Sequence, residues 1–150
     1  MGLLEILLFL IIAIFLTTCS TRSPMNPLGD LEPVLGLSAQ GQENSITLTF
    51  YSANDEDNFD GFNVYISESN NVASGPDGSR PLTPTGSEPT LQARPSEIDT
   101  NKEWQYTVEY SDNQGSPLST GVEYYFVIRA LSSDGRVSAP SNEVSASLNP

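Results

Sequence analysis

The titratable side chains of this 150-residue chain argue against catalysis. The sequence has 19 acidic residues, 6 basic residues, one cysteine and no histidine. The commonest general base and the commonest zinc ligand are therefore missing. Lys102 is the single lysine and has no obvious activating partner, and no glycine-rich phosphate loop is present. We expect a protein that is not an enzyme and has no cofactor. The net charge of −13 also opposes binding to nucleic acid.

The densest group of possible metal ligands is the acidic stretch at residues 54–61, NDEDNFDG. Asp55, Asp57 and Asp60 carry carboxylates, which are hard oxygen ligands suited to calcium. Counted from Glu56, the spacing matches only the first half of a calcium-binding loop, because the first ligand should be aspartate and the twelfth position falls on Ser67 instead of glutamate. Two interpretations follow. We favour a solvated acidic loop with no specific metal, and the alternative is a weak calcium site.

Aromatic side chains offer a second kind of binding surface. Trp104, Tyr106 and Tyr110 alternate along one expected strand, so they share a face. That face is either domain core, which we expect, or a platform for a sugar ring. Tyr65 and Tyr125 are expected to face solvent, and they are the better candidates for exposed aromatic contacts.

The N-terminus carries an export signal. Residues 6–16 form an unbroken apolar run, which is shorter than the roughly 20 residues that span a membrane and is typical of a signal-peptide core. The following Leu-Thr-Thr-Cys, ending at Cys19, resembles the bacterial lipobox. This resemblance implies cleavage after residue 18 and acylation of Cys19. The alternative is an uncleaved anchor helix beside a free thiol.

The lipobox resemblance sets the expected domain boundaries and location. Residues 1–18 are the signal peptide, residues 19–32 a lipidated tether containing proline and glycine, and residues 33–149 the folded domain. In the lipoprotein family an aspartate after the cysteine signals retention at the inner membrane. Ser20 occupies that position. The resemblance therefore implies a protein of the bacterial cell envelope, attached to the outer membrane where the host has one.

The domain is composed of short alternating segments separated by turn residues, which is typical of a two-sheet antiparallel β-sandwich. Leu35 and Leu37 are expected on one face of the first strand, and Ile46, Leu48 and Phe50 on the core face of the second. Residues 70–100 hold many prolines and glycines, so this long loop is either functional or a tolerated flexible insertion. The expected strands are 33–39, 45–51, 61–67, a short edge strand at 91–94, 102–110, 118–131 and 142–148.

The segment from Leu118 to Leu131, LSTGVEYYFVIRAL, resembles the fibronectin type III pattern in which Leu, Gly and Tyr lead into an alternating strand ending in Ala. The resemblance implies an immunoglobulin-like sandwich. It makes Tyr124 the corner tyrosine, whose hydroxyl bonds to nearby backbone, and Gly121 part of the turn before it. Phe50 occupies the place of the family's inward tryptophan.

These observations predict a non-catalytic, lipid-anchored envelope protein. Its fibronectin type III-like domain would bind a protein or glycan, or act as a spacer. The alternative is a calcium- or carbohydrate-binding module that uses the acidic loop or the exposed aromatics. We expect any partner at one end of the sandwich, where two loops should lie. The candidate contact residues are Asp55, Asp57, Asp60, Asp134 and Arg136.

Overall fold

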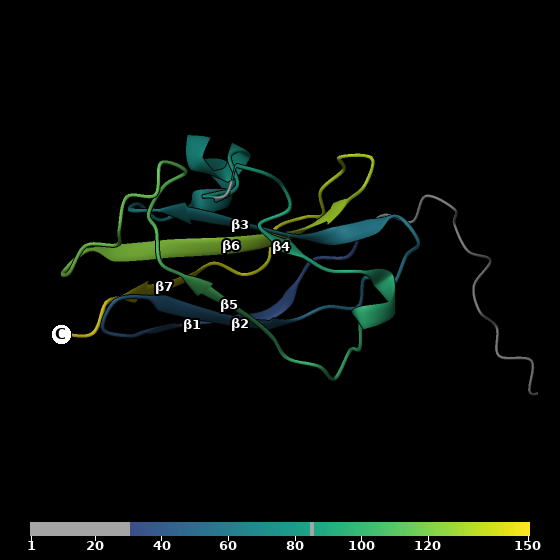
Figure 1. Cartoon of the computed structure of the whole chain (residues 1–150), viewed down its shortest axis with the longest axis horizontal. Coiled ribbons are helices and arrows are strands. Elements are labelled where there is room, and N and C mark those ends of the chain that lie inside the picture. The colour runs from purple at the N-terminus through teal and green to yellow at the C-terminus, as the bar shows by residue number, and fades with distance from the viewer. Residues whose placement is uncertain (1–30, 85) are drawn as a thin grey trace, which may run out of the picture.

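A computed structural model describes residues 31–84 and 86–150 of the chain as a β-sandwich (Figure 1). The predicted all-β fold with two antiparallel sheets is confirmed. The predicted signal peptide, Cys19 and most of the predicted tether lie outside the described residues. Within the described ranges, no helix is long and apolar enough to cross a membrane. The strands are β1 (Leu35–Gly41), β2 (Ile46–Tyr51), β3 (Phe59–Ser67), β4 (Leu91–Gln92), β5 (Trp104–Val108), β6 (Glu123–Ser132) and β7 (Val144–Ser147). Short 3₁₀ turns are η2 (Val72–Ser74), η3 (Pro76–Ser79) and η4 (Pro95–Glu97).

The seven strands form two layers. One sheet has the order β1-β2-β5 and the other the order β4-β3-β6-β7. In Figure 1, β3, β4 and β6 lie above β1, β2 and β5. All strand pairs are antiparallel. Each layer turns alternate side chains toward the other, so one apolar row per strand is enough to build the core.

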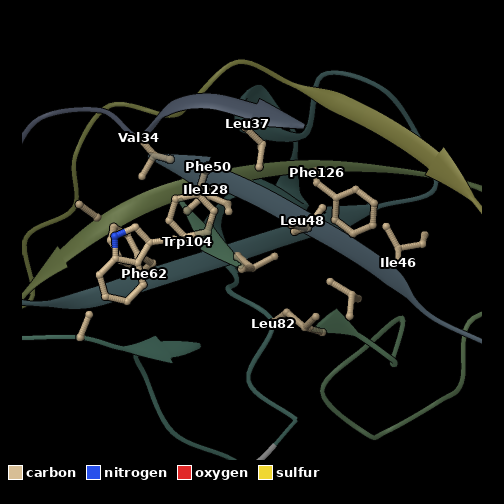
Figure 2. Packing of buried hydrophobic residues seen from close by; sticks show 14 of the residues in the cluster. Val34, Leu37, Ile46, Leu48, Phe50, Phe62, Leu82, Trp104, Phe126 and Ile128 are labelled. Atoms are coloured by element: carbon tan, nitrogen blue, oxygen red, sulfur yellow. The ribbon is translucent and has the colours of Figure 1, made fainter. Parts of the chain in front are cut away.

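The core fills the space between the layers (Figure 2). Ile46, Leu48 and Phe50 of β2 are fully buried, as the alternation predicts. Phe62 makes edge-to-face ring contacts across the core, at 4.9 Å from Phe50 and 5.3 Å from Trp104 between ring centroids. Such pairs add about 0.5–1.5 kcal/mol each beyond the area that they bury.

The first strand departs from its predicted pattern. Leu37 is buried, but Leu35 is 56% exposed although both were expected on the same face. The register shifts between Leu35 and Ser38, as in a β-bulge, and Gly36 has a φ of +62°. The irregularity reverses the side-chain alternation, and glycine accepts this backbone conformation without strain.

The proline-rich stretch after β3 is folded against the four-stranded sheet. Val72 of η2 packs with Tyr65 and Val127 on the outer face of that sheet. Further along, the backbone N–H of Leu82 donates to the carbonyl of Val64. Tyr65 is therefore only 4% exposed, and the prediction that it faces solvent is wrong. Its cover comes from a segment whose prolines and glycines hide any periodic pattern.

Two asparagines join the sheets on the side where β1 and β7 approach each other. The Nδ2 of Asn142 donates to the carbonyl of Leu37 at 2.9 Å, and its Oδ1 accepts from the N–H of Leu37 at 3.1 Å. Asn149 donates through Nδ2 to the carbonyl of Gly41. These amides satisfy backbone groups of the β1 edge that would otherwise have no partner.

The chain between β6 and β7 also runs beside β6. Ser138 and Ser141 donate their backbone N–H groups to the carbonyls of Ala130 and Ile128, at 3.0 and 2.9 Å. Their hydroxyls in turn accept from the N–H groups of the same two residues. Serine hydroxyls thus replace backbone carbonyls, while Pro140 between them interrupts a regular strand.

The corner before β6 has the geometry expected of a corner tyrosine. Tyr124 is buried, and its hydroxyl accepts a hydrogen bond from the N–H of Ser119 at 2.9 Å. Gly121 lies in this turn with a φ of +79°, a conformation that side chains rarely adopt.

Candidate functional site at the loop end

The two loops proposed as partner-binding lie side by side at one end of the sandwich. Because β3 starts where its antiparallel neighbour β6 ends, the loop before β3 meets the turn after β6. The N–H of Ser133 donates to the carbonyl of Asn58 at 2.8 Å, and Phe59 pairs with Ser132. We call this surface the loop end, comprising residues 52–58 and 132–138.

The turn at residues 132–136 is held by its own polar groups. The hydroxyl of Ser132 donates to the carboxylate of Asp134 and accepts from the N–H of Arg136. Asp134 also pairs with Arg136, with 2.9 Å between Oδ2 and Nε. The hydrogen bond from Ser132, followed by the guanidinium of Arg136, holds the pKa of Asp134 below its ordinary value. The turn therefore presents a half-exposed arginine in a fixed position.

The acidic loop is ordered by its first residue. Asn54 is fully buried, accepting from the N–H of Glu32 at 2.7 Å and donating to its carbonyl at 3.0 Å. Asp55 and Asp57 are exposed. Asp60, predicted to lie in the same loop, is instead part of β3, because this strand begins at Phe59, two residues earlier than predicted.

This separation bears on the calcium alternative. Within residues 31–84 and 86–150, no group of three or more acidic, cysteine or histidine side chains is placed to hold a metal ion. The side chain of Asn54 is committed to the backbone of Glu32 and to the hydroxyl of Ser52.

Glu56, the first position of the partial calcium-loop match, also belongs to the loop end, although it was not among the predicted contact residues. Burial is the main cause that raises the pKa of its carboxyl, and the neighbouring charges of Asp55 and Glu32 add to the effect. Its Oε2 and the Nδ2 of Asn58 are shielded from solvent and have no partner among the described residues. In the sequence, only the position of Glu56 among other acidic residues could have suggested that its pKa is raised.

A depression of about 500 Å³ opens beside the turn. It is lined by Leu31 and by residues 135–139. Val137 is 46% exposed there, and the Nη2 of Arg136 is shielded from solvent without a partner among the described residues. An apolar wall next to a guanidinium can contact a mixed apolar and acidic surface. Val137 gave no sequence signal, because a single valine after a turn is common.

The aromatic candidates lie elsewhere. Trp104 is buried and Tyr106 packs against the core, so the core interpretation of their face is confirmed. Tyr110 lies beyond the end of β5 and is exposed. Tyr125 is half-buried, with its hydroxyl donating to Glu123 at 2.9 Å. None of these rings reaches the depression.

No protein-family model and no curated protein matches the chain. Solved structures do resemble it. A Bacteroides uniformis protein provisionally described as carbohydrate binding aligns over 77% of this chain and 56% of its own, with 20% identity and a TM-score of 0.50. The β-1,2-glucanase of Parabacteroides distasonis aligns over 82% of this chain and 13% of the enzyme, with 20% identity and a TM-score of 0.48. The spore cortex lytic enzyme SleM of Clostridium perfringens aligns over 84% and 30%, with 18% identity and a TM-score of 0.43. The chain thus spans little more than half of the first protein and a minor part of the two enzymes, and the likeness is one of fold alone.

Proposed function

We propose that this chain is a lipid-anchored, non-catalytic binding module of the bacterial cell envelope, and that its loop end holds a partner protein. The proposal depends chiefly on one observation. Two loops far apart in the sequence are joined by the Ser133–Asn58 hydrogen bond, next to a depression with an exposed valine and a half-exposed arginine. Binding residues are disproportionately found on such loops, held by a rigid scaffold.

The anchor is inferred from the lipobox resemblance at Cys19. Leu31, which lines the depression, follows Cys19 by 12 residues, so a fully extended chain separates them by at most about 43 Å. A partner held at the loop end would lie close to the membrane surface. We also propose that the domain is of the fibronectin type III class, supported by the corner contact of Tyr124.

Photocrosslinking in intact cells tests the loop end. A photoreactive amino acid replaces Val137 in the full-length chain, and in the control it replaces Glu43, which is exposed in the turn between β1 and β2. We expect a discrete crosslinked protein from position 137 that is absent from position 43. Adduct patterns that are identical at the two positions, or no adduct at position 137, would overturn the proposal.

The anchor has a separate test. Metabolic labelling with palmitate should mark the wild-type chain and leave the Cys19→Ala variant unlabelled. Equal labelling of both would remove the anchor without affecting the loop-end experiment, because that experiment measures contacts of the folded domain.

A second candidate function is carbohydrate binding. The observation that favours it is the similarity of the sandwich to the provisionally described carbohydrate-binding protein, over most of this chain. Similarity of fold alone does not carry function, so this candidate needs a surface that suits a sugar. The outer face of the three-stranded sheet is such a surface.

A further inference from the structure

The outward side chains of the sheet β1-β2-β5 form an uncharged face. Two ranks of residues cross the three strands, because each residue lies opposite a partner on the next strand. One rank is Gln40, Thr47 and Thr107, and the other is Ser38, Thr49 and Gln105. We call these six residues the uncharged face. All carry hydroxyl or amide groups, although the chain has 25 charged residues.

Most polar groups of this face are available to a ligand. Thr47 is the exception, because it is only 7% exposed and its hydroxyl accepts from Nε2 of Gln42 at 3.0 Å. Gln40, Gln105 and Thr107 are exposed, and their side chains make no hydrogen bond within the described part of the chain. The hydroxyls of Ser38 and Thr49 hydrogen bond to each other at 2.7 Å, which fixes them in the plane of the face. Each amide offers both donors and acceptors, and each hydroxyl does the same.

One end of the face is apolar. Leu35 and Tyr51 are opposite each other on β1 and β2, and they are 56% and 37% exposed. The irregularity at Gly36 that turns Leu35 outward creates this end. The hydroxyl of Tyr51 donates to Glu103 at 3.2 Å, which limits the rotation of the ring. An aromatic ring that is exposed on one side and held at its polar tip is suited to stacking.

We propose that the uncharged face binds a neutral polysaccharide that lies across β1, β2 and β5, with Tyr51 stacked against one sugar ring. This inference rests on the second candidate function, carbohydrate binding. Neutral sugars combine many hydroxyl groups with apolar ring faces. The two ranks can hydrogen bond to the hydroxyl groups, and Tyr51 can stack on a ring face. Strands about 4.8 Å apart and same-face residues about 7 Å apart make the surface roughly 10 by 14 Å, enough for about two or three sugar rings.

Charge and composition disfavour other occupants. The net charge of −13 disfavours an acidic polysaccharide. The centre of a protein–protein interface is normally rich in aromatic residues and poor in serine, whereas both ranks consist of hydroxyl and amide side chains. A neutral polysaccharide is not repelled by the negative charge, and its hydroxyl groups suit a surface of hydroxyl and amide side chains.

Affinity electrophoresis tests the proposal. The full-length chain, in a polyoxyethylene detergent that carries no sugar, runs in native gels containing hydroxyethyl cellulose, galactomannan or β-1,3-glucan, with polygalacturonate as the anionic comparison. We expect at least one neutral polysaccharide to retard the protein. Thr107→Glu and Tyr51→Ala should weaken this retardation about tenfold or more. Thr120→Glu introduces the same charge at an exposed position in the turn before β6, and it should bind as wild type.

The outcomes separate the two claims. If a neutral polysaccharide retards wild type, Thr107→Glu and Tyr51→Ala equally, carbohydrate binding stands and the uncharged face is not its site. If none retards the protein, both claims fail. Gln105→Ala, which removes one exposed amide from an otherwise unchanged strand, should also weaken binding, and unchanged urea midpoints of all variants exclude unfolding as the cause. A dimer in gel filtration that Thr107→Glu disperses would identify a second copy as the occupant and overturn the proposal.

Discussion

Replacing Asn142 should reveal how much the contact between the sheet edges contributes to stability. The Asn142 amide accepts from the backbone N–H of Leu37 and donates to its carbonyl. Asn142→Ala removes both hydrogen bonds, and no other described residue replaces them. Leu37 is buried. An unsatisfied buried backbone group costs about 1–3 kcal/mol. Since the site is partly reached by water, we expect the free energy of unfolding to fall by about 2–4 kcal/mol.

Urea unfolding of the full-length chain measures this loss. The fluorescence of Trp104, the single tryptophan and a buried one, reports the transition. Asn113→Ala is the matched control. Its amide also accepts from a backbone N–H and donates to a backbone carbonyl, those of Thr83 and Pro81, but at an exposed position. We expect this control to lose less than about 1 kcal/mol.

Asn142→Asp adds a pH signature. A carboxylate can accept from the N–H of Leu37, but it repels the Leu37 carbonyl, so the folded state would raise the pKa of this new acid. An acid whose pKa is raised by folding contributes stability that is fully present below its unfolded-state pKa. This contribution is lost as the pH rises through its folded-state pKa. The free energy of unfolding of Asn142→Asp should therefore come closer to that of wild type as the pH is lowered. Equal losses in Asn142→Ala and Asn113→Ala, or a pH-independent deficit in Asn142→Asp, would refute the reasoning.

Three further predictions follow from the same structure. Tyr124→Phe should cost about 1–2 kcal/mol in the urea assay, because the N–H of Ser119 loses its acceptor; a change below about 0.3 kcal/mol would contradict the corner contact. Glu56→Gln should stabilise the protein at pH 7, because burial raises the pKa of Glu56 in the folded state and its charged form is disfavoured there. This gain should vanish below about pH 4, where the acid is protonated in both states, and a gain independent of pH would rule out titration as its origin. Millimolar calcium should leave the thermal midpoint of the chain unchanged, because Asp60 lies in β3 apart from the loop carrying Asp55 and Asp57; a clear rise would mean that a calcium site exists.

The strands that the sequence predicted well are those with strict alternation. In β2 the apolar residues occur at every second position and face the core, so periodicity placed Phe50. In β6 alternation put Tyr124 on the core face, although Val127 on the opposite face is buried as well. The outward turn of Leu35 escaped prediction, since an irregularity depends on how two strands pair and leaves no periodic signal. The burial of Tyr65 depends on Val72, which belongs to a separate turn.

The candidate site also has features that the sequence predicted and features that it did not. That the loops around Asp55 and Asp134 share one end follows from antiparallel connectivity, and the fold resemblance was enough to predict it. The parts contributed by Glu56 and Val137 depend on burial and exposure in three dimensions. The uncharged face could have been found from the sequence only if the register of three strands had been known.

The interrupted chain beside β6 has a consequence for aggregation, which matters most if the proposed anchor at Cys19 concentrates the protein on a membrane. Anchored proteins meet repeatedly in two dimensions, where an open sheet edge would recruit the edge of a neighbour and start a fibre. Ser138 and Ser141 turn their hydroxyls inward to β6, and Pro140 between them has no N–H to offer outward. This border lacks the continuous row of backbone donors that a foreign strand needs, so it is closed to edge-to-edge pairing.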